Sequence, residues 1–562
     1  MSAMRAGPQP PSADAVPTTW TTGSTEVFRT GTWRSALPRH LQAPSPCREA
    51  CPVNGDIAEW IALARAGDWR GAWTVLTRHN PFPAVAGRIC HHPCESACNR
   101  AAYDEALSIC GLERFVGDEA LAQGWTFDAP PAARASHVAV VGGGPAGLSA
   151  AFQLRRRGWR VSLYEAASAL GGLMRHGIPS YRLARTVLDA EIARIVALGV
   201  EVHLQAPLAG PAALQSLRQA HDAVFLATGA ARPRRLHGVP GLRYDGRRVL
   251  DGAAFLAAAT AGRPPPLGHA VVVIGGGSAA LDAARSARRA GHAVHVVALE
   301  ARAQMPAQRE EVEEALEEGI TLVDAAQLVR VDAAGDRLLL QVRRVDFVPA
   351  PGTGAGQVQA RADGGFALEA DAVLVSIGQD PDLAPFEGIV ACTDTLLDCG
   401  RDGTTTTPGL WAGGDLASRA RFVTEAVGMG KRAALAIHHT LLGSTPALAP
   451  FEEVVAAQAI ATWYHPPAAR RRAARLDAAA RLADGAEVQL GLDGTQVRAE
   501  AARCFSCGTC IACDNCVIVC PDLAVLRTAT GGYAVLTDYC KGCGLCVREC
   551  PTGAMRMEEE TA

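Results

Sequence analysis

Residues 138–154 read VAVVGGGPAGLSAAFQL, an apolar β-branched run followed by a glycine-rich turn and a helical pattern. Gly142, Gly144 and Gly147 form a G-x-G-x-x-G sequence in this strand–turn–helix context, which is typical of a dinucleotide-binding unit. The first glycine permits the tight turn, the second lets a pyrophosphate approach the backbone, and the third lets helix and strand pack closely. The helix N-terminus then faces the phosphates. We therefore predict an α/β fold that contains a Rossmann-like domain, and a glycine-rich turn without a ligand is the alternative interpretation.

The next apolar segment, VSLYE, ends at Glu165, about eighteen residues beyond the turn. A carboxylate at the end of this strand accepts hydrogen bonds from ribose hydroxyls. Glu165 is therefore the predicted ribose ligand of the first site.

A second unit begins at residues 271–285, VVVIGGGSAALDAAR, where Gly275, Gly277 and Ala280 repeat the turn. The strand that follows ends at Glu300. A carboxylate there hydrogen-bonds the 2′-hydroxyl of NAD and repels the extra phosphate of NADP, so we predict NADH as the preferred cofactor. Two alternatives stay open: Arg302 meets the phosphate of NADP(H), or Glu300 is a solvated strand end.

A third glycine-rich segment, GMGK at 428–431, lacks the earlier glycine and the Ser or Thr of a phosphate-binding P-loop. Nucleotide hydrolysis is therefore excluded.

Ten of the eighteen cysteines lie between residues 504 and 550, in two runs that each end in Cys-Pro. In bacterial ferredoxins three thiolates of such a run bind one [4Fe–4S] cluster, and the fourth crosses to the neighbouring cluster. Zinc is the competing interpretation, but two full runs closed by Cys-Pro favour iron–sulfur. Cys504 and Cys507 extend the first run backwards as alternative ligands, thiols without metal or a pair that faces a partner. The predicted sets are Cys510, Cys513, Cys516 and Cys550 for one cluster, and Cys540, Cys543, Cys546 and Cys520 for the other.

Several segments resemble the glutamate synthase small-subunit family over residues 40–445. They are RICHHPCESAC at 88–98, GGLMRHGIP at 171–179, ATG at 227–229 and TTTTPGLWAGGD at 404–415. The resemblance implies FAD at the first site and a nicotinamide dinucleotide at the second. It also implies that Asp415 contacts the ribityl-phosphate side of FAD. Leu299 and Glu300 stand where this family typically carries paired arginines. The implied FAD ligands are Gly172, Arg175, Thr228, Gly229, Gly414 and Asp415.

The same resemblance implies iron–sulfur binding by the N-terminal cysteines. One cluster would take Cys51, Cys90, Cys94 and Glu113. A second would need two cysteines upstream of Cys47, where the chain has Arg39 and Gln42, so Cys47 and Cys98 complete it only if Cys110 or a histidine joins them. One N-terminal cluster is the prediction. His91 and His92 are expected to line the pocket.

These features predict six segments along the chain. Residues 1–38 form a flexible tail, 39–135 a helical iron–sulfur domain, and 136–250 with 391–445 the FAD-binding domain. Residues 251–390 form the NAD(P)-binding domain, 446–500 a connector of helical, Ala- and Arg-rich composition, and 501–562 a ferredoxin-like domain with two [4Fe–4S] clusters.

Composition limits the classes of partner and the cellular compartment that we expect for this protein. The net charge is −3, with 54 basic and 57 acidic residues, so nucleic acid and anionic membranes are not expected partners. No segment resembles a signal peptide or a membrane span, and so many cysteines in a large chain indicate metal clusters in a reducing compartment. We expect a cytoplasmic protein.

Three functions compete. The first is an electron-transfer oxidoreductase that works between NAD(P)H and a protein partner, such as a 2-oxoacid:acceptor oxidoreductase or ferredoxin. The second is the small subunit of glutamate synthase, from which Glu300 and the C-terminal cysteine runs depart. The third is a redox-sensing scaffold without turnover, which the intact dinucleotide motifs disfavour. No residue is predicted to act as a catalytic acid, base or nucleophile.

Overall fold

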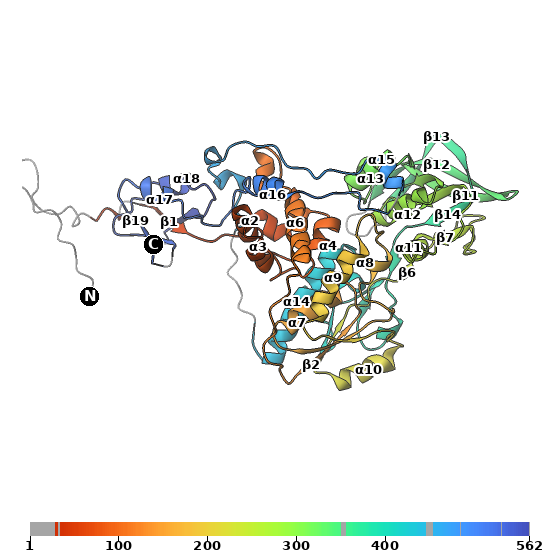
Figure 1. Ribbon diagram of the computed structural model, residues 1–562, viewed down its shortest axis with the longest axis horizontal. Helices are drawn as coiled ribbons and strands as arrows, with labels where there is room; N and C mark the ends of the chain where they lie inside the picture. Colours follow the sequence, from red (N-terminus) through yellow and green to blue (C-terminus); the bar gives the residue numbers. More distant parts are fainter. Residues whose placement is uncertain are drawn as a thin grey trace, which may run out of the picture. The chain divides into compact units, whose positions relative to one another are not determined.

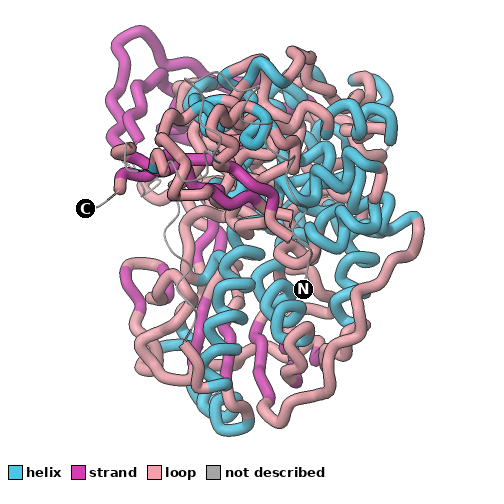
Figure 2. The backbone as a smooth tube through the Cα atoms, turned by 90° about the vertical axis from the view of Figure 1, so that its left-hand side faces the viewer, coloured by secondary structure: helices cyan, strands magenta, loops and turns pink. Residues whose placement is uncertain are grey.

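The computed structural model describes residues 29–31, 34–349, 356–445, 453–483, 485–529 and 531–560 (Figure 1). The chain forms two compact units. The smaller unit comprises Met1–Pro46, Phe451–Ala468 and Phe505–Ala562. The larger unit comprises Cys47–Pro450 and Ala469–Cys504. Figure 2 shows that long loops connect many short helices and strands.

The larger unit begins with a group of helices around a small apolar core. Helix α2 ends at Gly67, whose φ of 81° stops the helix in the left-handed conformation. Trp60, Trp73 and Leu112 are buried where the helices meet. The main helices are α2 (Ile57–Ala66), α3 (Trp69–Leu76), α4 (Pro83–Ile89) and α6 (Ile109–Ala122), with the short α1 (Pro46–Ala50), α5 (Pro93–Ser96) and 3-10 turn Asn99–Ala102.

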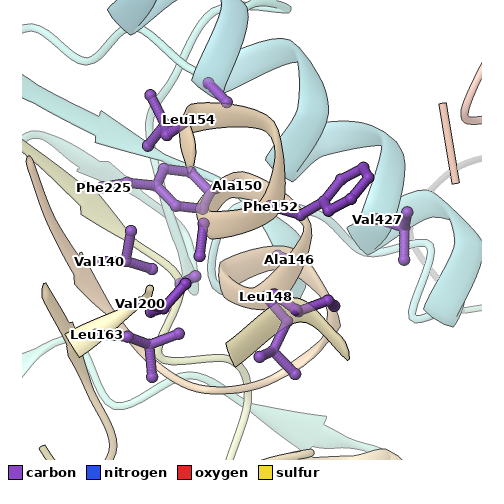
Figure 3. Close-up of a cluster of buried hydrophobic side chains, with 14 of the residues drawn as sticks. Val140, Ala146, Leu148, Ala150, Phe152, Leu154, Leu163, Val200, Phe225 and Val427 are labelled. Carbon is purple, nitrogen blue, oxygen red and sulfur yellow. The ribbon is translucent and has the colours of Figure 1, made fainter. Parts of the chain in front are cut away.

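A parallel five-stranded sheet follows, in the order β18-β5-β2-β3-β4. Helix α7 (Pro145–Arg155) follows β2, and α14 (Val423–Leu442) packs against α7. Figure 3 shows the buried side chains of this region, among them Val140 and Leu163 on the sheet and Phe152 on α7. The strands are β2 (His137–Val141), β3 (Arg160–Tyr164), β4 (Glu201–His203), β5 (Ala223–Leu226) and β18 (Leu410–Ala412), and the other helices are α8 (Leu173–His176), α9 (Arg185–Val196) and α10 (Pro211–Ala220).

A second parallel sheet has the order β10-β9-β8-β14-β7. It carries an antiparallel sheet of β11 (Ala326–Ala334), β12 (Arg337–Pro349) and β13 (Gly356–Ala370) between β10 and β14 in the sequence. Short pairs complete the larger unit: β6 (Arg232–Pro233) with β15 (Gln379–Asp380), and β16 (Cys392–Thr393) with β17 (Leu396–Leu397). The parallel strands are β7 (Val249–Asp251), β8 (Ala270–Ile274), β9 (Ala293–Val297), β10 (Thr321–Val323) and β14 (Ala372–Val375), and the helices are α11 (Gly252–Thr260), α12 (Ser278–Arg289) and α13 (Arg309–Glu317).

The described residues of the smaller unit include two antiparallel strand pairs and two short α-helices. Strand β1 (Ala36–His40) pairs with β21 (Met555–Glu559), and β19 (Val525–Arg527) pairs with β20 (Tyr533–Val535). Helices α17 (Asn515–Ile518) and α18 (Leu545–Arg548) each follow a cysteine pair. Residues 1–28 of the predicted tail lie outside the described residues, while its last residues belong to β1.

The stretch 446–500 is divided between the two units. Its composition predicted helices, but residues 465–477 are irregular, so this expectation was wrong there. Two prolines, 466 and 467, lack the amide hydrogens that a helix interior needs. Residues 469–493, here called the Arg-rich segment, instead bind acidic side chains of the larger unit, as in the pairs Arg470–Glu95 and Arg472–Glu105. Among the described residues of this stretch, α15 (Ala478–Ala483) and α16 (Gly494–Ala501) are the α-helices.

Within the described part of the chain, no helix combines the length and the apolar character needed to cross a membrane.

Candidate dinucleotide and cluster sites

The first and third glycines of the first turn are required by the packing of the protein itself. Gly142 has a φ of 110°, and a Cβ there would overlap the carbonyl oxygen of Ala227. A Cβ on Gly147 would overlap the carbonyl oxygen of Gly142. The first contact places the turn after β2 against the segment after β5, and the second places the start of α7 against the same turn.

The second glycine has no such explanation. Gly144 has a φ of −81°, which any residue adopts, and a Cβ there would meet only the Cα of Gly172, at 4.0 Å. The position lies at the N-terminus of α7, where backbone amides are available to a phosphate. The open space is therefore suited to a bound pyrophosphate.

The carboxylate of Glu165 lies beside this turn. It accepts hydrogen bonds from the backbone amides of Gly143 and Ala167, both at 2.7 Å. The loop that follows is also close: the amide of Gly171 donates to the carbonyl of Gly143 at 2.8 Å, and Gly172 has a φ of 51°. Arg175 donates from Nε to the carbonyl of Leu170 in the same loop.

The remaining predicted FAD ligands lie at the ends of neighbouring strands. Thr228 and Gly229 follow β5, next to Gly142. Gly414 and Asp415 follow β18, and a Cβ on Gly414 would lie 2.9 Å from the Cβ of Ala146 on α7. Burial raises the pKa of Asp415. Because the C-terminal ends of parallel strands meet at one edge of the sheet, these residues gather around the N-terminus of α7.

The second turn has the same construction. Gly275 has a φ of 139°, and a Cβ there would overlap the carbonyl oxygen of Ser376. Ala280 is fully buried on α12. Gly277 has a φ of −91°, and a Cβ there would meet nothing within 4 Å. The open position again lies at the N-terminus of a helix, so it is suited to a second pyrophosphate.

Glu300 lies beside this second turn, as Glu165 does beside the first. A Cβ on Gly276 would contact the Glu300 carboxylate, and burial raises the pKa of Glu300. Arg302 is exposed, and its backbone amide donates to Asp324 at 2.8 Å. The half-buried carboxylate thus lies against the turn, whereas Arg302 is exposed to solvent.

The N-terminal helices bring Cys51, Cys90, Cys94 and Glu113 into one group of buried and half-buried side chains. Hydrogen bonds from Cys110 and Thr424 lower the pKa of Cys90 to about 6, against the effect of burial. Burial, and then the charge of Cys94, raise the pKa of Cys51 to about 12. Burial, and then the charge of Cys90, raise the pKa of Glu113 to about 8. The residues therefore influence one another's ionisation, as ligands that share a metal site would.

Cys110 also belongs to this group, although the sequence alone did not assign it to a cluster. It lies on α6 one turn before Glu113, is buried, and is hydrogen-bonded to Cys90 and Cys94. Ligand atoms of His92, Glu95 and Cys110 also lie within 4.8 Å of one another. The spacing of three residues between Cys110 and Glu113 could have indicated this membership, because it puts both side chains on one face of a helix.

Helix α14 contacts both this thiol group and the first dinucleotide turn. Thr424 Oγ1 lies 3.5 Å from the Sγ of Cys90, and a Cβ on Gly428 would overlap the carbonyl oxygen of Pro52. A Cβ on Gly430 would overlap the carbonyl oxygen of Ala146, at the start of α7. Lys431, excluded above as a P-loop lysine, donates from Nζ to the carbonyl of Val53 at 2.7 Å. One helix therefore links the two sites.

The smaller unit groups its cysteines into two sets. A pocket is lined by Cys510, Cys513, Cys516 and Cys550, together with Tyr533 and Ile511. Cys540, Cys543 and Cys520 in turn influence the ionisation of Cys546, whose pKa is raised to about 11 chiefly by burial. The fourth cysteine of each run thus lies with the first three of the other run. This crossing suits two adjacent four-thiolate clusters.

Residues 136–430 match the pyridine nucleotide-disulphide oxidoreductase family. The chain belongs to this family. Residues 38–125 match the 4Fe-4S cluster domain II of dihydropyrimidine dehydrogenase, and residues 533–556 match a 4Fe-4S binding domain. These matches confirm the predicted class, an NAD(P)H-dependent oxidoreductase with FAD and iron–sulfur clusters.

Three relatives show which members of the family this chain is similar to. The chain is 35% identical to the NADP(+)-dependent formate dehydrogenase subunit beta of Moorella thermoacetica, over 82% of this chain and 70% of that protein. It is 32% identical to the glutamate synthase [NADPH] small chain of Azospirillum brasilense, over 70% and 85%. It is 31% identical to the NAD-dependent dihydropyrimidine dehydrogenase subunit PreT of Escherichia coli O157:H7, over 71% and 92%. The resemblance to glutamate synthase small subunits is confirmed.

Proposed function

We propose that this chain is the electron-transfer subunit of a larger oxidoreductase and works between a nicotinamide dinucleotide, preferably NADH, and a protein partner. The relatives named above support a catalytic subunit of the formate dehydrogenase kind as the partner, and a 2-oxoacid:acceptor oxidoreductase or a ferredoxin would fit the same role. FAD supplies the conversion between a two-electron hydride and the single electrons that [4Fe–4S] clusters carry. We further propose that the protein acts in the cytoplasm, where thiols grouped for iron–sulfur binding stay reduced.

The observation that carries this proposal is the open second glycine of each turn. Neither backbone conformation nor packing requires glycine at Gly144 or Gly277, so a ligand that approaches the backbone is the physical reason for both. The N-termini of α7 and α12 then stabilise two pyrophosphates. Glu165 and Glu300 lie beside these turns and would orient the riboses.

We assign the proposed ligands as follows. FAD is held by residues around α7, the nicotinamide cofactor by residues around α12, and the iron–sulfur clusters by the three thiol groups. The FAD ligands are Gly142, Gly144, Gly147, Glu165, Gly172, Arg175, Thr228, Gly229, Gly414 and Asp415, the nicotinamide ligands are Gly275, Gly277, Ala280 and Glu300, and the N-terminal cluster ligands are Cys51, Cys90, Cys94 and Glu113.

A methyl group at Gly277 tests the proposal. In Gly277→Ala we expect KM for NADH to rise at least about tenfold, because the methyl group occupies the space of the pyrophosphate. FAD content and thermal stability should stay unchanged, since the methyl group meets no protein atom within 4 Å. Steady-state reduction of an artificial dye and flavin absorbance provide the measurements.

Gly365→Ala is the matched control, because a Cβ at that exposed strand position would meet only the carbonyl oxygen of Val342, at 3.6 Å. An unchanged KM in Gly277→Ala would refute the assignment of the second site. If NADH and NADPH both fail to bleach the bound flavin of the wild-type protein, the redox-sensing scaffold is the better function. Co-purification with a glutamate synthase large subunit would favour the glutamate synthase alternative.

A further inference from the structure

Several hydrogen bonds reach the sulfur of Cys90, a proposed ligand of the N-terminal cluster. The side chain is 8% exposed. The backbone amide of His92 donates to its Sγ at 3.4 Å, and the hydroxyl of Thr424 lies 3.5 Å from the same atom. The thiol of Cys110 is also hydrogen-bonded to it. The amide belongs to the ligand loop itself, whereas Thr424 and Cys110 approach the sulfur from two other helices, α14 and α6.

The hydroxyl of Thr424 is the donor in its contact with Cys90. A cysteine binds iron as a thiolate, which carries no proton and can only accept a hydrogen bond. Thr424 is 6% exposed, and a hydroxyl buried to this extent needs a hydrogen-bond partner. The hydrogen bond therefore runs from Oγ1 to the ligand sulfur.

Thr424 belongs to the domain that we assign to FAD. It lies in the first turn of α14, two residues before Ala426, and a Cβ on Gly414 would lie 3.8 Å from the Cβ of Ala426. Phe422, which precedes the same helix, packs its ring against that of His91, with the ring centroids 4.0 Å apart. The start of α14 thus contacts both the loop proposed to hold FAD and the loop that carries the cluster ligand.

A hydrogen bond to a ligand sulfur changes the reduction potential of an iron–sulfur cluster. The reduced cluster carries one more negative charge than the oxidised cluster, and part of this charge lies on the ligand sulfurs. A donor at the sulfur therefore stabilises the reduced form more than the oxidised form, which raises the potential. The carboxylate of Glu113, the fourth proposed ligand, adds negative charge and acts in the opposite direction.

We propose that Thr424 is a positioning residue that raises the reduction potential of the N-terminal [4Fe–4S] cluster by donating a hydrogen bond to the Sγ of Cys90. Because this donor stands on α14, the FAD-binding domain itself increases the affinity of the neighbouring cluster for an electron. That effect favours electron transfer out of the flavin toward this cluster. The inference rests on the proposed iron–sulfur function and deepens it by naming a residue that controls the first transfer.

A redox titration of the anaerobically purified full chain tests this inference, with dithionite as the reductant and paramagnetic resonance as the readout. The N-terminal signal is the one that remains in both Cys513→Ser and Cys543→Ser, each of which alters one cluster of the smaller unit. Thr424→Val keeps the shape of the side chain and removes the hydroxyl. At a fixed potential we expect its ratio of reduced to oxidised N-terminal cluster to fall about tenfold, which equals about 59 mV for a one-electron couple. Iron and FAD contents should stay unchanged.

Two further variants separate the hydrogen bond from packing. Thr424→Ser keeps the donor and should keep the wild-type potential. Thr440→Val is the matched control, because Thr440 is an exposed threonine of the same helix, and it should change neither the potential nor the cofactor content.

Two outcomes would overturn the inference. The first is an unchanged potential of the N-terminal cluster in Thr424→Val that holds its full iron content. The second is an equal shift in Thr424→Ser, which would show that packing rather than the hydroxyl sets the potential. If Thr424→Val does not retain its iron, Thr424→Ala, which also lacks the hydroxyl and adds no bulk, decides by the same measurement. Failure of the proposed function would appear separately, as flavin that NADH does not reduce, because dithionite reduces the cluster without NADH.

Discussion

At the scale of single residues, Glu300 and Arg302 favour different nicotinamide cofactors. Glu300 favours NADH, and Arg302 would favour NADPH. Two of the relatives are named for NADP or NADPH and one for NAD, so family membership does not choose between them. The half-buried carboxylate of Glu300 lies beside the second turn, while Arg302 is exposed. A carboxylate in this place accepts the ribose hydroxyl and repels a phosphate.

We therefore predict that Glu300→Ala raises the ratio of kcat/KM for NADPH to that for NADH at least about tenfold, since a hydrogen bond to a charged group contributes about 1.5–3 kcal/mol. Dye reduction with each cofactor measures the ratio. Arg302→Ala is the control and should leave NADH use unchanged. A constant ratio in Glu300→Ala would show that the carboxylate does not select the cofactor.

At the scale of elements, α14 is the helix on which the two kinds of site depend. Its glycines allow close contact on two sides, at Gly428 with the carbonyl of Pro52 and at Gly430 with the carbonyl of Ala146. The helix can approach both backbones only because these positions lack a Cβ.

Gly428→Val should therefore push α14 away from the segment that carries Cys51, at a cost of about 1–3 kcal/mol for the overpacked contact. We expect the iron content to fall by about four per chain, one cluster, while most of the FAD is retained. Metal analysis and flavin absorbance measure both. Thr440→Ala, at an exposed position of the same helix, should change neither. An unaltered iron content in Gly428→Val would mean that this contact does not support the cluster.

At the scale of the larger unit, the Arg-rich segment joins parts that are far apart in the sequence. Glu487 accepts hydrogen bonds from Arg88 Nε and Arg114 Nη2, both at 2.8 Å, and from the amide of Ala184 at 3.0 Å. Earlier in the same segment, Arg481 donates to Glu317 on α13 at 2.7 Å. The segment thus contacts the helical domain and both parallel-sheet domains of this unit.

Glu487→Ala leaves two largely buried guanidinium groups without this partner, and we predict a loss of about 3 kcal/mol of stability. The urea midpoint and the rate of proteolysis within residues 469–493 measure the effect. Arg472→Ala is the control: its side chain is 67% exposed, and loss of such a surface pair should cost less than about 1 kcal/mol. Equal effects of the two substitutions would show that the segment is not anchored at Glu487.

The α/β class, the two dinucleotide turns and the cofactor types could all be predicted from the amino-acid sequence. These features depend on residues that are neighbours in the chain, since a G-x-G-x-x-G turn is built from six consecutive residues and a ferredoxin run from eleven. Local pattern also located Glu165 and Glu300, because a strand end lies at a fixed offset from the turn before it.

Which distant residues meet became known from the folded structure. It showed that Cys110 lies with Cys90 and Cys94, that α14 contacts both the thiol group and the first turn, and that the Arg-rich segment binds along the larger unit. It also gathered Cys510, Cys513 and Cys516 with Cys550 around one pocket. Evenly spaced cysteines are equivalent in the sequence, and they become distinct only when the folded backbone fixes which partners each thiol can reach.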